Sequence, residues 1–461
     1  MSSRGKYRLI GTVLAIVTIH SVLLFVIIPS VSARLGPMYN QERYADGYDQ
    51  LAANLEAGNG YRFYPDTART LMREPGYPIM LAGLQMTFGK SFTVVKLANM
   101  AMALITAWGM VLIAGKVWPD AMANRSVMIL VPSLLYLLDP GVLIAESRGG
   151  VENLFALLVT AFLLTVYKAI QSQRWRDFVV SGLILGLTLY VRSTPMLFPL
   201  CLLGYLAITQ RRRISPTVML KNIAAMTVTM LVVLSPWIYR NYVLVGKFVP
   251  TASVLGVSAQ AGQYIGEHIS DGKPWYLLDR EASRERDKVA IELGYPFEDG
   301  ASGYYQTFYR SGDELRFSDY LLRKVIAGYR ESPLLFVKCV TRNVFNFWFA
   351  GKTSMATFGN IVVQLPYLAF ALIGAVYSIR KREARIVGPM VLLIGYIMAV
   401  HLPILAQARY SVPLFPMVCL MAAMGLMATR KRLMERFVGG TDVESGRVDM
   451  AEARESHARV G

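Results

Sequence analysis

The chain has 461 residues, of which 54% are hydrophobic and only 17% charged, and its mean hydropathy is +0.39. Soluble domains carry about a quarter charged residues, and a helical span needs roughly 20 mostly apolar residues. Many segments of the chain reach or approach that length, which excludes a soluble protein. The net charge of +17 does not indicate nucleic-acid binding, because the basic residues form short clusters between apolar runs, where membrane proteins place their cytoplasmic charge.

An apolar run at residues 9–31 follows a basic N-terminus that contains Arg4, Lys6 and Arg8. The run is longer than the hydrophobic region of a typical signal peptide, and no clear cleavage site of small residues follows it. We therefore interpret it as the first transmembrane span, with its basic flank in the cytoplasm.

Nine further apolar runs bring the predicted number of spans to ten. They lie at residues 92–115, 121–139, 152–168, 178–192, 195–210, 217–239, 361–379, 386–405 and 411–429. Alternation then places five basic clusters on the side of the N-terminus: Lys116 with Arg125; Lys168, Arg174 and Arg176; Arg211–Arg213; Arg380, Lys381, Arg382 and Arg385; and Arg430, Lys431 and Arg432. Since positive charge marks cytoplasmic loops, both termini are predicted to be cytoplasmic.

The predicted fold class is an all-α polytopic membrane protein with helices at its outer face. Two shorter apolar stretches, 76–89 and 333–351, are predicted to be interfacial or re-entrant helices, because counting the first as a span would invert every later basic cluster. The predicted segments are a first span at 1–31, a first outer loop at 32–91, spans two to seven at 92–239, a large outer lobe at 240–360, spans eight to ten at 361–429, and a polar cytoplasmic tail at 430–461 that we expect to be disordered.

Acidic residues gather at three places on the predicted outer face. The first follows span one and holds Glu42, Asp46 and Asp49, the second is the segment around Glu74, and the third is the loop 139–152. Any single one of these acids is explained by an exposed loop that carries charge. Together they meet the same face of the membrane, where charge is costly unless it is paired, solvated or functional.

Three arginines stand at predicted outer helix ends, where the positive-inside bias disfavours them. Arg192 ends span five, Arg240 ends span seven, and Arg409 precedes span ten. Arginines that snorkel to an interface are common, so each has a structural explanation. Three of them opposite outer carboxylates instead indicate an anionic ligand, and guanidinium groups suit phosphate. A phosphate at this interface is most simply linked to a lipid.

At these residues the sequence resembles the GT-C membrane glycosyltransferases, and in particular the bacterial relatives of dolichyl-phosphate-mannose protein mannosyltransferases, which include lipid A aminoarabinose transferases. The resemblance covers roughly residues 8–430. It is carried by five stretches in order: residues 48–61; Glu74-Pro75-Gly76-Tyr77-Pro78 and the helix that follows it; Leu138-Asp139-Pro140 with Glu152-Asn153-Leu154-Phe155; residues 236–250, with Pro236-Trp237-Ile238-Tyr239-Arg240-Asn241-Tyr242; and Arg409-Tyr410-Ser411-Val412-Pro413-Leu414-Phe415-Pro416.

The resemblance implies a sugar donor linked to polyprenyl phosphate and an acid in the first outer loop that acts as catalytic base. In the family this acid usually lies about four residues before the tyrosine that matches Tyr48, but Tyr44 occupies that position here. Asp46 is the nearest acid and our first choice, with Glu42 and Asp49 as alternatives. A carboxylate in reach of a sugar hydroxyl can accept its proton during attack on the anomeric carbon.

The remaining candidates complete the predicted site. Asp139 and Glu74 are the next candidates for the base, and arginines are expected to stabilise the phosphate leaving group. The residues predicted to contact substrate are Glu74, Tyr77, Glu152, Arg192, Arg240, Arg409 and Tyr410, with Arg240 and Arg409 on the lipid phosphate. One base and a cationic cradle suffice for inversion of the anomeric centre.

Two other functions fit parts of the pattern. A polysaccharide polymerase or O-antigen ligase also has many spans and outer arginines, but it does not predict the first-loop acid followed by the Pro-Gly-Tyr-Pro helix. A transporter usually shows internal repeats and broken helices at mid-membrane, and the sequence shows neither. We expect an inner-membrane enzyme with its site on the extracytoplasmic side and a lipid, glycan or protein acceptor. The sequence requires no cofactor and leaves a divalent metal open.

Overall fold

The computed structural model describes residues 3–35, 46–118, 125–268, 271–299, 306–381 and 384–430, and helices dominate it. Glu42 and the predicted tail beyond Arg430 lie outside these residues. The first half contains α1 Ser3–Val22, η1 Leu23–Ile27, α2 Ile28–Leu35, α3 Tyr48–Glu56, α4 Gly76–Phe88, α5 Phe92–Val117, α6 Arg125–Leu137, α7 Pro140–Glu146, α8 Glu152–Ser172, α9 Trp175–Leu189, η3 Thr194–Leu197, α10 Phe198–Gln210 and α11 Pro216–Val245. The second half contains α12 Leu255–His268, α13 Trp275–Glu292, β1 Phe297–Asp299, β2 Gln306–Phe308, α14 Ser311–Glu331, α15 Pro333–Phe349, α16 Ser354–Arg380, α17 Ala384–His401, η5 Ala408–Tyr410 and η6 Val412–Leu414, after which a last helix runs to Arg430.

Six helical segments in the described residues are long and apolar enough to cross a membrane. They are Gly11–Arg34, Phe92–Val117, Glu152–Ser172, Pro216–Val245, Ser354–Arg380 and Ala408–Arg430. The shorter helices α6, α9, α10 and α17 occupy the positions of the other four predicted spans. The helical membrane fold is therefore confirmed, while the number of ten spans stays a prediction.

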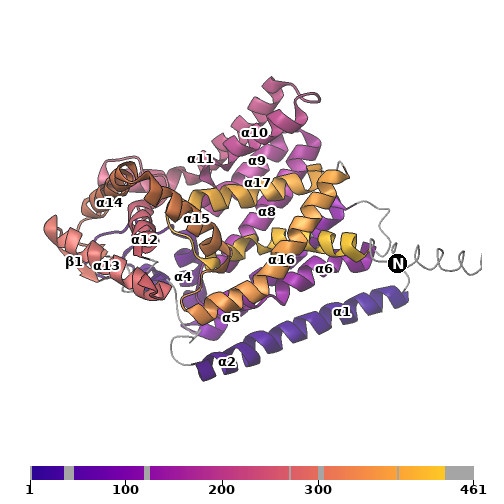
Figure 1. Cartoon of the computed structure of the whole chain (residues 1–461), viewed down its shortest axis with the longest axis horizontal. Coiled ribbons are helices and arrows are strands. Elements are labelled where there is room, and N and C mark those ends of the chain that lie inside the picture. Colours follow the sequence, from indigo (N-terminus) through magenta and orange to yellow (C-terminus); the bar gives the residue numbers. More distant parts are fainter. Residues whose placement is uncertain are drawn as a thin grey trace, which may run out of the picture.

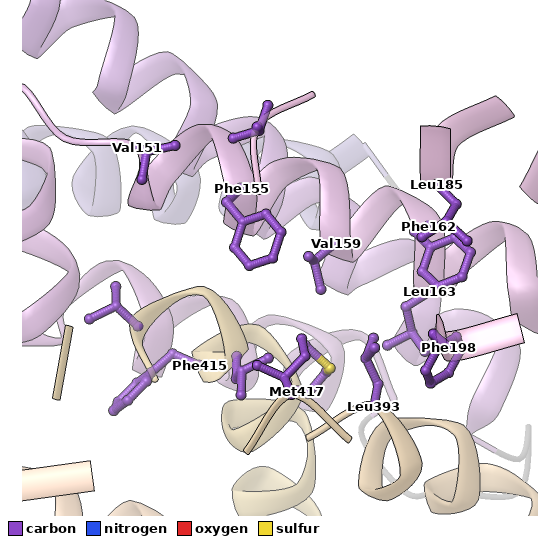
Figure 2. Packing of buried hydrophobic residues seen from close by; sticks show 14 of the residues in the cluster. Val151, Phe155, Val159, Phe162, Leu163, Leu185, Phe198, Leu393, Phe415 and Met417 are labelled. Carbon is purple, nitrogen blue, oxygen red and sulfur yellow. The ribbon is translucent and has the colours of Figure 1, made fainter. Parts of the chain in front are cut away.

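The core of the bundle forms around α8. Phe155, Val159 and Phe162 follow one another at helical spacing on one face and are buried, as the periodicity of an α-helix requires. Figure 2 shows this face opposite side chains of α9, α10, α17 and the last helix. The ring centroids of Phe162 and Phe198 lie 5.5 Å apart in an edge-on arrangement, which is a favourable geometry for aromatic pairs.

Small residues let α9 and α11 pack closely. Gly182 and Gly186 stand four residues apart, and a Cβ on Gly182 would come within 2.3 Å of the Met226 carbonyl oxygen on α11. Helices in a membrane gain little from the hydrophobic effect, so close backbone contact of this kind is a main source of their association. This packing fixes the loop after α9, which carries Arg192.

Helices α12 to α15 and the strands form a lobe at one end of the bundle (Figure 1). The pairing of β1 with β2 is antiparallel and was not expected from the sequence. Glu314 on α14 ties the lobe to the first loop, because its carboxylate accepts hydrogen bonds from Thr70 Oγ1 at 2.8 Å, Leu71 N at 2.8 Å and Ser253 Oγ at 2.7 Å.

The two stretches predicted to lie at the interface fold as α4 and α15. Helix α4 has 13 residues and spans about 20 Å at 1.5 Å per residue, too little to cross a bilayer. Its outer side exposes Ile79, Met86 and Phe88. Helix α15 exposes Leu334, Phe336, Val337, Val344 and Phe345. Exposed apolar faces on short helices beside a bundle are typical of helices that lie in a membrane interface.

Candidate active site

Asp46 lies in a left-handed turn directly before α3. Its φ is 59°, and Gly47 after it has a φ of 73°. A non-glycine residue with positive φ costs free energy, and such conformations concentrate at functional sites. The turn directs the Asp46 carboxylate toward arginines from two distant parts of the chain.

Two arginines bind the Asp46 carboxylate. Arg409 Nη1 lies 3.2 Å from Oδ2 and its Nη2 donates to Oδ1 at 3.4 Å, while Arg73 Nη2 lies 3.6 Å from Oδ1. Burial by itself would raise the pKa of Asp46, but Arg409, Arg73 and Arg192 outweigh burial and hold this pKa well below its usual range. Asp46 is therefore ionised at every physiological pH.

The segment Glu74–Tyr77 connects this turn to the loop after α9. Glu74 Oε1 accepts a hydrogen bond from Ser193 N at 3.0 Å, and Gly76 N donates to Tyr190 O at 2.7 Å. A Cβ at position 76 would lie 2.7 Å from that same oxygen, so the glycine of the Pro-Gly-Tyr-Pro motif permits a close backbone approach. Glu74 and Gly76 thus position the loop that holds Arg192, while the Tyr77 ring packs on Tyr48 with the two ring centroids 5.0 Å apart.

Arg192 and Arg409 meet on the ring of Tyr410. Their guanidinium carbons lie 4.9 and 5.3 Å from the ring centroid, which favours both cations. Arg192 Nη2 lies 3.7 Å from Glu152 Oε1. Within the described residues, the buried Nε atoms of Arg192 and Arg409 have no hydrogen-bond partner, and the same holds for Arg240 Nη2.

Arg240 has a different set of partners. Its Nη1 donates to Thr70 O and Asn241 Oδ1, both at 2.9 Å, and its guanidinium carbon lies 4.4 Å from the centroid of the Trp237 ring. None of these partners belongs to the group around Asp46. The structure thus brings two of the three predicted arginines together and holds the third against the first loop.

The other candidate acids lie in dissimilar surroundings. Asp49 is half-buried in the first turn of α3, and burial raises its pKa. Asp139 is buried, and its Oδ1 accepts a hydrogen bond from Val142 N at 3.0 Å as the N-cap of α7, a role that stabilises helices. Glu42 lies outside the described residues. Of the described candidates, Asp46 has the closest arginines.

No sequence pattern distinguishes Asp279, yet the lobe brings it toward the site. Asp279 is half-buried on α13, and burial raises its pKa, with Arg286 and Arg409 opposing and Asp46 adding to this shift. Within the described part of the chain no hydrogen bond or ion pair engages its carboxylate. It lies in a charged helix of the lobe, and only the tertiary fold places it near Asp46.

The described residues offer no group of three or more histidine, cysteine, aspartate or glutamate side chains that could hold a metal ion. The arrangement found instead is an ionised carboxylate, Asp46, among Arg73, Arg192 and Arg409. Such a site can bind an anion through the arginines and present a carboxylate beside it.

Comparisons with known proteins agree with this fold. Residues 73–239 match the family model described as dolichyl-phosphate-mannose-protein mannosyltransferase. This range includes Arg73, Glu74, Glu152 and Arg192. No curated protein matches the chain significantly.

The solved structures that are similar to this chain include the following two. One is the archaeal oligosaccharyltransferase AglB from Archaeoglobus fulgidus in complex with an inhibitory peptide and a dolichol-phosphate, with a TM-score of 0.55, 12% identity, and coverage of 95% of this chain and 52% of that one. The chain therefore spans about half the length of that protein. The other is ArnT from Cupriavidus metallidurans bound to undecaprenyl phosphate, with a TM-score of 0.40, 13% identity, and coverage of 90% of this chain and 78% of that one.

The resemblance predicted from the sequence is thus confirmed by the family match and by the fold. Residues 73–239 are similar in sequence to the dolichyl-phosphate-mannose-protein mannosyltransferases, and the fold of the chain is similar to that of an archaeal oligosaccharyltransferase.

Proposed function

We propose that the chain is a glycosyltransferase that moves a sugar from a polyprenyl-phosphate donor to an acceptor of the cell envelope. The observation that carries the proposal is the Asp46 carboxylate held by Arg409 and Arg73, with Arg192 beside Arg409 on Tyr410. It combines a phosphate-binding cation group with a proton acceptor in one place, and the family match at 73–239 points to the same chemistry.

In this mechanism Arg192 and Arg409 bind the donor phosphate. Their position on one aromatic ring, next to the Asp46 carboxylate, suits an anion that needs several hydrogen bonds. As the bond from the anomeric carbon to the phosphate oxygen breaks, negative charge grows on the leaving polyprenyl phosphate. Fixed guanidinium groups stabilise that charge more in the transition state than in the ground state.

Asp46 is the proposed base. The acceptor hydroxyl oxygen forms the new bond to the anomeric carbon, and its proton passes to an Asp46 oxygen, so the step yields the glycoside, polyprenyl phosphate and a protonated carboxyl group. A carboxylate paired with Arg409 is a weak base. A bound phosphate competes for Arg409, which weakens its pairing with Asp46 and raises the basicity of Asp46 when the donor is present.

The position of Asp279 indicates where the acceptor binds. A carboxylate repels the donor phosphate, so the space next to Asp279 suits groups that donate hydrogen bonds, such as sugar hydroxyls. Since α13 belongs to the lobe at one end of the bundle (Figure 1), we propose that the acceptor enters from the lobe side.

The proposed orientation puts the lobe on the extracytoplasmic side of the inner membrane and both termini in the cytoplasm. The five basic clusters support it. Reporter fusions at Lys381 and at Ser302, which lies outside the described residues, should report cytoplasmic and outer locations respectively. An outer location at Lys381 would overturn the ten-span topology.

The function is tested with the purified full chain in lipid nanodiscs. The probes are synthetic polyprenyl phosphates that carry mannose, glucose, galactose or aminoarabinose, incubated with membranes from a deletion strain as the acceptor source. We expect release of polyprenyl phosphate and gain of one sugar mass in the membranes with one of these donors, and neither with Asp46→Asn. Wild-type protein that neither binds polyprenyl phosphate nor consumes any donor would overturn the proposal.

A further inference from the structure

The first span touches the bundle through few side chains. Helices α1 and α2 lie along one edge of the bundle (Figure 1). Between residues 11 and 34, where the structure describes the side chains, the buried ones are His20, Leu24 and Ser32. A helix with so little buried surface has few contacts to fix its height and rotation, although the chain that follows it leads to Asp46.

His20 makes two short polar contacts at this interface. Its Nδ1 lies 2.7 Å from Leu137 O, and its Nε2 lies 2.8 Å from Glu146 Oε2. Both side chains are 0% exposed. An ionisable pair enclosed at a transmembrane helix is costly, and such pairs mark functional positions.

The geometry fixes the protons of this pair. A carbonyl oxygen only accepts hydrogen bonds, so Nδ1 carries a proton, and one further proton lies between Nε2 and the Glu146 carboxyl group. Whether that proton is on the imidazole or on the carboxyl group, both hydrogen bonds form. The contact is therefore directional, unlike an apolar contact, which tolerates sliding.

Glu146 transmits this contact to the active site. It ends α7, and Asn99 Nδ2 donates to Glu146 O at 3.0 Å and to Arg148 O at 2.9 Å. Arg148 interacts electrostatically with Glu152 and Arg409. A short path thus leads from His20 on the first span to Arg148, which lies within electrostatic range of Glu152 and Arg409.

We propose that His20 and Glu146 are positioning residues that lock the first span to α7 and so set the distance between Asp46 and the arginine group. This inference rests on the proposed function for its catalytic effect. Replacing a buried ion pair by apolar residues of similar volume often preserves or increases stability. A pair that serves stability alone would therefore be replaceable by two leucines, whereas a positioning pair would not.

The test measures the position of the first span separately from activity. Ser21 Oγ lies 3.7 Å from Met100 Sδ on α5, so Ser21→Cys with Met100→Cys, in a chain whose three native cysteines are replaced, reports docking by disulfide yield. The variants are His20→Leu with Glu146→Leu, and Glu146→Gln, which can still donate from its amide to Nε2. Ser30→Leu, at an exposed position on α2 of the same span, is the matched control.

For the double leucine variant we expect unchanged thermal stability, a severalfold lower disulfide yield, and a kcat about 10- to 100-fold lower, since small displacements of reacting groups have effects of this size. The donor KM should stay within about threefold, because Arg192 and Arg409 are not on the first span. Glu146→Gln should retain most of the wild-type disulfide yield and kcat.

Wild-type disulfide yield and kcat in the double leucine variant would overturn the proposal. If the wild-type chain uses no polyprenyl-phosphate sugar, the proposed function fails, and the disulfide yields still decide whether the pair positions the span.

Discussion

Two carboxylates of this protein, Asp46 and Glu314, have opposite surroundings. Glu314 accepts hydrogen bonds from Thr70, Leu71 and Ser253, which are neutral donors. Asp46 is held by the guanidinium groups of Arg409 and Arg73. Burial raises the pKa of Glu314, whereas the arginines keep the pKa of Asp46 well below its usual range.

We interpret the difference as that between a structural carboxylate and the proposed catalytic one. Neutral donors of the fold satisfy Glu314 permanently, and they join the lobe to the first loop. The arginines that hold Asp46 can exchange it for another anion, because a phosphate offers the same kind of acceptor.

Asp46→Asn should lower the rate of sugar transfer by about 10²–10⁴, the usual contribution of a general base. The change keeps the shape of the side chain and removes the proton acceptor, so the protein should still fold and insert. Transfer is measured at saturating donor, with size-exclusion behaviour as the check on folding.

Asp49→Asn and Glu42→Gln are the controls for Asp46 and should have smaller effects. If one of them is inactive while Asp46→Asn retains near wild-type transfer, the base is that residue. If all three variants stay active, the base is elsewhere, with Asp139 and Glu74 as the next candidates.

Arg409→Ala should weaken donor use by roughly tenfold to a hundredfold, since hydrogen bonds to charged groups contribute about 1.5–3 kcal/mol. Arg409→Lys should restore only part of this, because an ammonium lacks the planar fork. The measurement is the donor concentration at half-maximal rate.

Arg240→Ala should have a smaller effect on donor use than Arg409→Ala, because Arg240 is already engaged by Thr70 and Trp237. An equal loss in both variants would place Arg240 at the phosphate after all.

The sequence predicted the membrane fold and its helices well, because long apolar runs and basic clusters act locally along the chain. It could also indicate Asp46, Arg192 and Arg409, since charges near an apolar segment stand out. It could not separate Arg240 from the other two, because all three stand at similar helix ends and only the tertiary contacts differ. Asp279 and the pairing of His20 with Glu146 depend on packing between distant segments, which no local pattern reveals.

Glu314→Leu should destabilise the protein by about 1–3 kcal/mol for each buried donor that it leaves without a partner. Glu314→Gln should be much milder, because an amide can accept from Leu71 N and donate to the Thr70 hydroxyl group. Thermal unfolding in nanodiscs compares the two variants. The rate per folded molecule should fall far less in Glu314→Leu than in Asp46→Asn. A loss of rate without a loss of stability would mean that Glu314 belongs to the active site.

Asp279→Asn should have the smallest effect and an asymmetric one. An asparagine still accepts a hydrogen bond but no longer offers a charged acceptor, so transfer to deletion-strain membranes should fall about fivefold, which corresponds to about 1 kcal/mol. Hydrolysis of the donor by water needs no acceptor sugar and should stay the same or rise, because the lost negative charge no longer opposes phosphate at Arg409. Glu292→Gln, at an exposed position of the same helix, should change neither rate. A parallel fall of transfer and hydrolysis in Asp279→Asn would show that Asp279 serves the donor or the base rather than the acceptor. Asp279 would then act on the Asp46 side of the site, together with the arginines.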